Sequence, residues 1–172
     1  GMGGGEAERE GRHHRRLRKV AFTCHLVAAV LSACLGLVYF LTPRLMPHHS
    51  SALQGVALHQ MEPAYRTLFV VFYRMIGAGS VVTALGTISL LLGSFRENKR
   101  WSFFAVPLLV LTFWGTFLST TLYLKRNTDA EPSVYISVAV ILCSLVGLLT
   151  SLCLPVRGPP RDEGIPGKEK SQ

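Results

Sequence analysis

The sequence predicts an all-α protein: a bundle of four transmembrane helices, with a short interfacial helix in the first loop. Four apolar runs carry this prediction, at residues 20–41, 68–93, 101–124 and 134–154. Each has about 20 residues or more, which suffices to cross a hydrocarbon core about 30 Å thick at about 1.5 Å of helical rise per residue. The segments between the runs are too short to bury a soluble core. The chain is therefore expected to form one membrane domain.

The boundaries of this domain follow from the apolar runs. We expect a basic cytoplasmic tail at residues 1–19, the transmembrane domain at 20–155 and a disordered cytoplasmic tail at 156–172. The first run is longer than the roughly 7–15 apolar residues of a signal-peptide core, so a retained span is expected there. The four spans are expected at about residues 20–42, 64–93, 101–124 and 133–155.

The net charge of +8 is spread unevenly over the segments that flank the spans. Thirteen basic residues fall in the two tails and in the loop between the second and third spans. Only four fall on the opposite side, namely Arg44, Arg66, Lys125 and Arg126. The positive-inside rule therefore predicts that both termini are cytoplasmic. The stretch "RHHRRLRKV" before the first span is then expected to contact anionic lipid headgroups, and nucleic acid is not an expected partner.

Small residues predict where the helices touch, because lipid tails remove the hydrophobic drive between helices and close approach must supply the contacts. In the second span they recur every seven residues, which predicts a packing seam. A compact bundle and a homo-oligomer could both use such a seam, and both interpretations stay open. The predicted packing residues are Ala28, Ser32 and Gly36 in the first span, Gly79, Gly86 and Gly93 in the second, and Ser144 and Gly147 in the fourth.

The first loop, "TPRLMPHHSSALQGVALHQMEPAYR", is too apolar for a simple tether. Ser51 with Gln54 resembles a capping box, and Pro63 prevents a helix from continuing past it. These signals predict a short helix over residues 52–61, lying in the membrane interface. Glu62 is then expected to cap the second span, with Pro63 at its first helical position.

Arg74 is the single charge inside the apolar run of the second span, and no Asp or Glu occurs within any span. An arginine at the bilayer centre costs about 2.5–3.5 kcal/mol. Either its guanidinium extends to the headgroups as an anchor, or it forms the positive end of a pocket for a phosphate, a carboxylate or another anion. Thr112, Thr116 and Ser119 form a hydroxyl stripe at i, i+4 and i+7 in the third span. The predicted anion pocket therefore consists of Arg74, Tyr39, Thr112, Thr116 and Ser119.

Other motifs predict little chemistry. His48, His49 and His59 are metal-ligand types, but their spacing matches no defined motif, so no metal site is expected. His25, near the cytoplasmic end of the first span, is expected to be hydrogen-bonded or hydrated rather than part of a proton relay. The sequence carries no nucleotide-binding loop and no metalloprotease helix, and no cofactor is expected.

The layout resembles that of small four-span families such as the DoxX-like proteins. The features that carry the resemblance are the four spans, the proline after the first helix, and the arginine-glycine stretch "YRMIGAG" in the second. The resemblance covers residues 20–155. It rests on architecture, so it transfers no functional residue to this chain.

Three functional hypotheses follow. The leading one is a non-enzymatic multipass membrane protein that binds a lipid or serves as an adaptor subunit for a membrane-protein partner. The second is a small membrane enzyme or redox accessory subunit acting on a lipophilic substrate in a pocket around Arg74. The third is a transporter or channel subunit, although the lack of acids inside the spans argues against proton coupling. Membrane lipids are the expected partners, and another membrane protein or a second copy of the chain are the further candidates.

Overall fold

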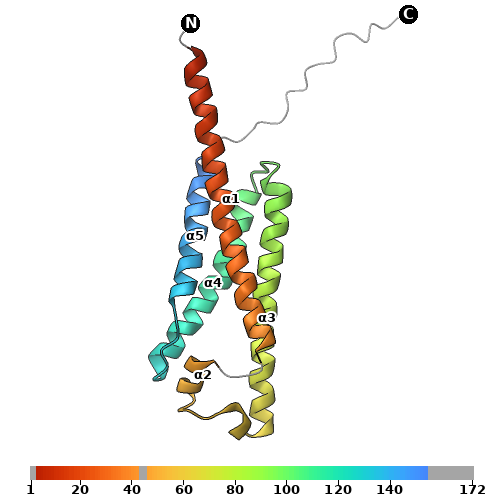
Figure 1. Cartoon of the computed structure of the whole chain (residues 1–172), viewed down its shortest axis with the longest axis vertical. Coiled ribbons are helices and arrows are strands. Elements are labelled where there is room, and N and C mark those ends of the chain that lie inside the picture. The colour runs from red at the N-terminus through yellow and green to blue at the C-terminus, as the bar shows by residue number, and fades with distance from the viewer. Residues whose placement is uncertain (1–2, 43–45, 155–172) are drawn as a thin grey trace, which may run out of the picture.

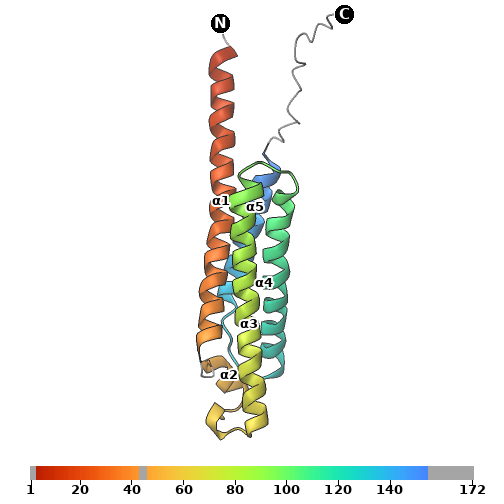
Figure 2. The same ribbon diagram turned by 90° about the vertical axis from the view of Figure 1, so that its right-hand side faces the viewer.

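The computed structural model describes residues 3–42 and 46–154; for residues 3–7, 47 and 48 it describes the backbone alone. Four long helices pack as a bundle (Figures 1 and 2), which confirms the predicted fold class. In chain order the elements are α1 (Gly3–Leu41), α2 (Pro47–Ala52), the 3-10 turn η1 (Leu58–Gln60), α3 (Pro63–Leu90), the π-helical turn η2 (Leu91–Phe95), α4 (Ser102–Asn127) and α5 (Tyr135–Leu152).

The long helices α1, α3, α4 and α5 are each long and apolar enough to cross a membrane, which indicates a multipass membrane protein. Large apolar side chains cover the outside of the bundle. Soluble monomers rarely expose contiguous apolar patches larger than a few hundred Å², so hydrocarbon is the solvent that suits this surface. One leucine from each long helix is more than half exposed: Leu37, Leu85, Leu108 and Leu149.

The interior, by contrast, holds many small and polar side chains. This distribution agrees with a bundle in lipid, where helices approach through small residues and hydrogen bonds rather than through large apolar side chains. The buried polar residues are His25, Ser32, Ser80, Thr83, Thr87, Ser102, Ser137, Ser144 and Ser151.

The bundle has two distinct ends. At the terminal end, α1 begins and α5 finishes, and α1 projects beyond the other helices (Figures 1 and 2). The opposite end, which we call the loop end, carries α2, η1 and the connection from α4 to α5 (Figure 1). The basic segment expected as a separate tail at residues 1–19 is helical from Gly3 and continues α1. The tail expected at residues 156–172 lies outside the described part of the chain.

The short helix of the first loop is present, but it lies earlier than the sequence predicts. The predicted range was 52–61, whereas α2 covers Pro47–Ala52. Gln54 and Gly55 follow it with φ of 53° and 82°, a left-handed conformation that ends a helix. Residues 52–61 therefore contain a turn and the short η1 rather than one helix.

The capping signals explain this shift. The predicted capping box starting at Ser51 is wrong, because Ser51 lies in the last turn of α2 and not ahead of a helix. One of the two hydrogen bonds of such a box forms at η1 instead, where the side-chain oxygen of Gln60 accepts a hydrogen bond from the backbone N–H of Ala57 at 3.0 Å. Glu62 occupies the N-cap position of α3 and Pro63 its first helical position, as predicted, but the Glu62 side chain makes no capping hydrogen bond.

The backbones of α1 and α3 approach each other closely at Gly36 and Gly77. A Cβ added to Gly77 would lie 2.7 Å from the carbonyl oxygen of Gly36 and 2.7 Å from the backbone nitrogen of Phe40. The two helices therefore touch backbone to backbone at this point. One turn further towards the terminal end, the Ser80 hydroxyl donates to the carbonyl oxygen of Ser32 at 2.7 Å.

The three glycines of the predicted seam do not act alike. A Cβ on Gly79 would lie 3.3 Å from the Phe113 ring, and a Cβ on Gly86 would lie 3.1 Å from the Leu109 side chain. Both glycines thus face α4. Gly93 has no atom within 4 Å of an added Cβ, so it makes no close contact in the described structure. The face that touches α1 was not predicted.

A hydrogen-bond network joins α1 to α4 across the middle of the bundle. The indole N–H of Trp114 donates to the Ser32 hydroxyl oxygen at 2.7 Å, and that hydroxyl donates to the Ala28 carbonyl oxygen at 2.8 Å. Trp114 and Ser32 are fully buried. The network satisfies the polar atoms of both residues without water.

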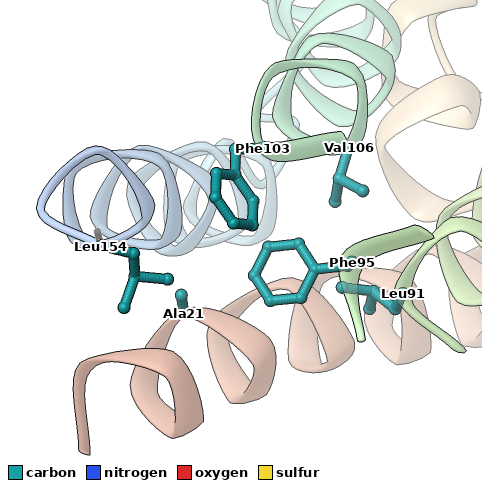
Figure 3. Packing of buried hydrophobic residues seen from close by; sticks show 6 residues of the cluster. All are labelled: Ala21, Leu91, Phe95, Phe103, Val106 and Leu154. Atoms are coloured by element: carbon teal, nitrogen blue, oxygen red, sulfur yellow. The ribbon is translucent and has the colours of Figure 1, made fainter. Parts of the chain in front are cut away.

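An apolar core closes the terminal end of the bundle (Figure 3). Phe95 of η2 meets Phe103 of α4 edge to face, with ring centroids 5.2 Å apart and planes at 70°. Such aromatic pairs stabilise packing beyond the area that they bury. The cluster consists of Ala21, Leu91, Phe95, Phe103, Val106 and Leu154.

Candidate functional site

A cavity of about 180 Å³ opens at the loop end, between the last turn of α1, η1 and the first half of α3. One part of its wall is apolar and the other carries hydroxyl and guanidinium groups. The polar lining residues are Tyr39, Thr42, Arg66, Tyr73 and Arg74. The apolar lining residues are Phe40, Leu41, Leu58 and Val70.

The two arginines give this cavity its charge. Arg66 and Arg74 are both exposed and stand eight residues apart on α3, which corresponds to about 12 Å along the helix axis. Neither forms an ion pair with a carboxylate in the described part of the chain. The ion pairs found there join Arg12 to Glu8 and Lys99 to Glu97. The cavity therefore presents two positive charges that no described side chain neutralises.

An aromatic cluster fixes the floor of the cavity. Tyr39 of α1 and Tyr73 of α3 are only 4% and 6% exposed, and their rings meet edge to face at 5.6 Å. The His49 ring of α2 lies 5.0 Å from Tyr73 and 6.2 Å from Tyr39. Phe117 of α4 completes the cluster at 6.1 Å from Tyr39. Four elements thus meet at this point, which attaches α2 to the bundle beside the arginines.

Only part of the predicted anion pocket comes together. Arg74 and Tyr39 line the same cavity, whereas Thr112, Thr116 and Ser119 are exposed on α4 and do not line it. The Thr116 hydroxyl donates to the Thr112 carbonyl oxygen within its own helix at 2.9 Å. Because that hydroxyl is satisfied locally, it can face lipid, and the stripe marks an outer face of α4 rather than a pocket wall.

Sequence reasoning missed Arg66 and Tyr73 as lining residues. Arg66 precedes the apolar run of the second span, and it lies in the first turn of α3. Its distance of eight residues from Arg74 was the available signal, since two such positions lie within about 80° of each other around a helix. Tyr73 directly precedes Arg74 in the sequence.

The loop histidines play different parts. His49 belongs to the aromatic cluster, and His59 is exposed on η1. The side chain of His48 lies outside the described part of the chain. Among the residues that the structure describes, no group of three or more His, Cys, Asp or Glu side chains converges on a metal-binding geometry.

A second, larger cleft of about 470 Å³ lies between α2 and the end of α4. It contains Arg126 together with Asp129, and Ser51 and Gln54 face them from the first loop. Because opposite charges share this cleft, its net field is weak. It suits an anion less well than the cavity of Arg66 and Arg74.

Comparisons with known proteins give no family for this chain. No protein-family model matches it, and neither the curated proteins nor the solved structures contain a match. The function proposed below therefore rests on the geometry of the cavity.

Proposed function

We propose that this multipass membrane protein is non-enzymatic and binds the anionic headgroup of a lipid in its loop-end cavity. The supporting observation is the pair of guanidinium groups, Arg66 and Arg74, which share one cavity and have no carboxylate partner among the described residues. Hydrogen bonds from arginine to phosphate are charge-assisted and often bidentate, so a lipid phosphate is the natural partner for these groups.

The size of the cavity supports a headgroup rather than a whole small molecule. Ligand pockets usually measure about 300–1,000 Å³, whereas this cavity measures about 180 Å³. A headgroup can occupy such a volume while its acyl chains stay in the bilayer. Phe40, Leu41 and Val70 line the cavity beside the charged groups and offer an apolar surface for the start of those chains.

The charge pattern supports an orientation for this site. The thirteen basic residues of the two tails and of the loop between α3 and α4 favour a cytoplasmic terminal end under the positive-inside rule. The loop end then lies outside, and the cavity takes its lipid from the outer leaflet. Tags on both termini should be protected from protease added outside intact cells. Cleavage of either tag would reverse the orientation and move the cavity to the inner leaflet.

The lipid itself can be tested by native mass spectrometry of the purified protein with phosphatidylglycerol or phosphatidylcholine added at equal concentration. We expect a preference for the anionic lipid, and we expect Arg74→Ala to abolish it. Arg126→Ala is the matched control, because Arg126 is an exposed arginine at the same end but lies in the other cleft. Equal lipid preference in wild type and Arg74→Ala would refute the proposed function.

A further inference from the structure

A second site, independent of the loop-end cavity, centres on His25 in the interior of the bundle. His25 is fully buried. Its ring lies against the backbone of Gly147 in α5, where an added Cβ would be 2.6 Å from Cε1 and 2.7 Å from Nε2. Phe95 meets the ring edge to face at 6.1 Å. Neither ring nitrogen has a hydrogen-bond partner in the described part of the chain.

Like His25, two hydroxyls on neighbouring helices are buried without a hydrogen-bond partner among the described residues. Thr87 of α3 and Ser144 of α5 are fully buried, and their hydroxyl oxygens have no hydrogen-bond partner among the described residues. Three helices thus each bring at least one unpaired polar group into the interior. Burying such groups without a partner is costly, so most buried polar groups in proteins are paired with protein or with ordered water.

The packing register places these groups at one level. Ser32 of α1 and Ser80 of α3 are in direct contact through a hydrogen bond. His25 lies seven residues before Ser32, and Thr87 lies seven residues after Ser80. Because α1 and α3 are antiparallel, two turns along each helix lead to the same height. Ser144 stands one turn from Gly147, which touches the His25 ring.

Small residues stand next to these polar groups on all three helices. Ala28 and Ala84, one turn from His25 and Thr87 on the facing stripes, are buried and carry only a methyl group. Gly147 has no side chain. On the far sides of the two hydroxyls, Leu91 and Val140 are bulky and fully buried. The small residues therefore lie on one side of each hydroxyl.

We propose that His25, Thr87 and Ser144 form an internal water-binding site, in which ordered water bridges the imidazole to the two hydroxyls. A neutral imidazole donates from one nitrogen and accepts at the other, and each hydroxyl can do both, so the groups match the donors and acceptors of water. Buried waters typically make about three hydrogen bonds to otherwise unpaired polar groups. The proposed ligand is therefore ordered water, held inside the bundle beside the His25 imidazole.

Solid-state NMR of the ¹⁵N-labelled protein in lipid bilayers tests this directly, by polarisation transfer from water protons to side-chain nitrogens. We expect transfer to the His25 ring at short mixing times. The indole nitrogen of Trp114 is the control, because it is equally buried but donates to Ser32. His25→Gln assigns the histidine signal and Trp101→Phe assigns the indole signals. If His25→Gln does not fold, His→Gln changes at the other five histidines assign the His25 signal by elimination.

A melting experiment supplies the second test. An unpaired hydroxyl at Thr87 predicts that Thr87→Val leaves the melting temperature unchanged or raises it, because valine keeps the shape and removes the polar group. A water-bound hydroxyl predicts a lower melting temperature. Thr83→Val is the control, since its hydroxyl already donates to the Gly79 carbonyl oxygen in the same helix. The proposal requires a larger decrease for Thr87→Val than for Thr83→Val. It is overturned if His25 receives no more water polarisation than Trp114, or if Thr87→Val melts at or above the wild-type temperature.

Discussion

Polar side chains in the middle of the bundle have hydrogen-bond partners on neighbouring helices, whereas the two arginines of the loop-end cavity have no described ion-pair partner. In the middle, Trp114 and Ser80 donate to Ser32 and all three are buried. At the loop end, Arg66 and Arg74 line a cavity and have no ion-pair partner among the described residues. The first arrangement holds helices together, because interhelical hydrogen bonds stabilise association in lipid. The second leaves charge available, which is what binding an anion requires.

The contrast teaches how to separate structural from functional polar residues in such a bundle. A polar group used for packing finds its partner on a neighbouring helix, and then nothing else needs to bind there. A polar group that finds none is a candidate to bind a ligand. Arg74 is such a candidate for an anion, and His25 for water.

The largest expected effect concerns the α1–α3 contact that supports both regions. Gly77→Ala should strongly destabilise the protein, because the new methyl group would collide with backbone atoms of Gly36 and Phe40. Gly86→Ala should cost much less, since it meets only the end of the flexible Leu109 side chain. Gly93→Ala should be nearly neutral, and melting temperatures in detergent would rank the three variants. Equal stability of Gly77→Ala and Gly93→Ala would contradict the close contact.

These glycines also show how much of the fold the sequence could predict. The number of long apolar helices follows from apolar runs of membrane length, and that part is confirmed. The contact faces were harder, because a helix that is apolar all round gives no signal for its rotation. Gly77 and Gly79 are two residues apart and therefore face nearly opposite directions, one towards α1 and the other towards α4. The seven-residue spacing predicts a helix contact at Gly79 and gives no signal for Gly77.

Part of the candidate site can be predicted from the sequence, and part cannot. The charge of Arg74 within an apolar run is visible in the sequence, and so is Tyr39. The direction of the threonine stripe of α4 is not visible, because a threonine can satisfy its hydroxyl on its own helix and face lipid. Thr116 does so through the Thr112 carbonyl oxygen. Periodicity alone cannot distinguish such a stripe from a pocket wall.

A second prediction tests the middle of the bundle. Ser32→Ala removes the acceptor of the Trp114 indole, and Trp114→Phe removes the donor. A double-mutant cycle of unfolding free energies should give a coupling of about 0.6 kcal/mol, the average for hydrogen bonds between membrane helices, and at most about 1.7 kcal/mol. Additive effects of the two changes would show that this hydrogen bond does not stabilise the bundle.

A smaller and more local effect is expected at the loop end. His49→Ala removes a ring that packs on Tyr73 and Tyr39, and contacts between aromatic rings are worth about 0.5–1.5 kcal/mol. We expect α2 to detach more often, which limited proteolysis of the first loop would detect as faster cleavage. His59→Ala is the control, because His59 is exposed on the same loop. Identical cleavage rates for the two variants would show that His49 does not hold α2 in place.

The central claim is that Arg74 binds a lipid phosphate. Replacing Arg74 with lysine tests it most directly. The measurement is the affinity for phosphatidylglycerol by native mass spectrometry of wild type, Arg74→Lys and the control Arg126→Lys. Lysine keeps the charge but lacks the planar fork that grips a phosphate with two hydrogen bonds. Losing one charge-assisted hydrogen bond of about 1.5 kcal/mol lowers affinity about tenfold. The account predicts that decrease for Arg74→Lys and none for Arg126→Lys. Wild-type affinity in Arg74→Lys would show that Arg74 is only an anchor in the headgroup region.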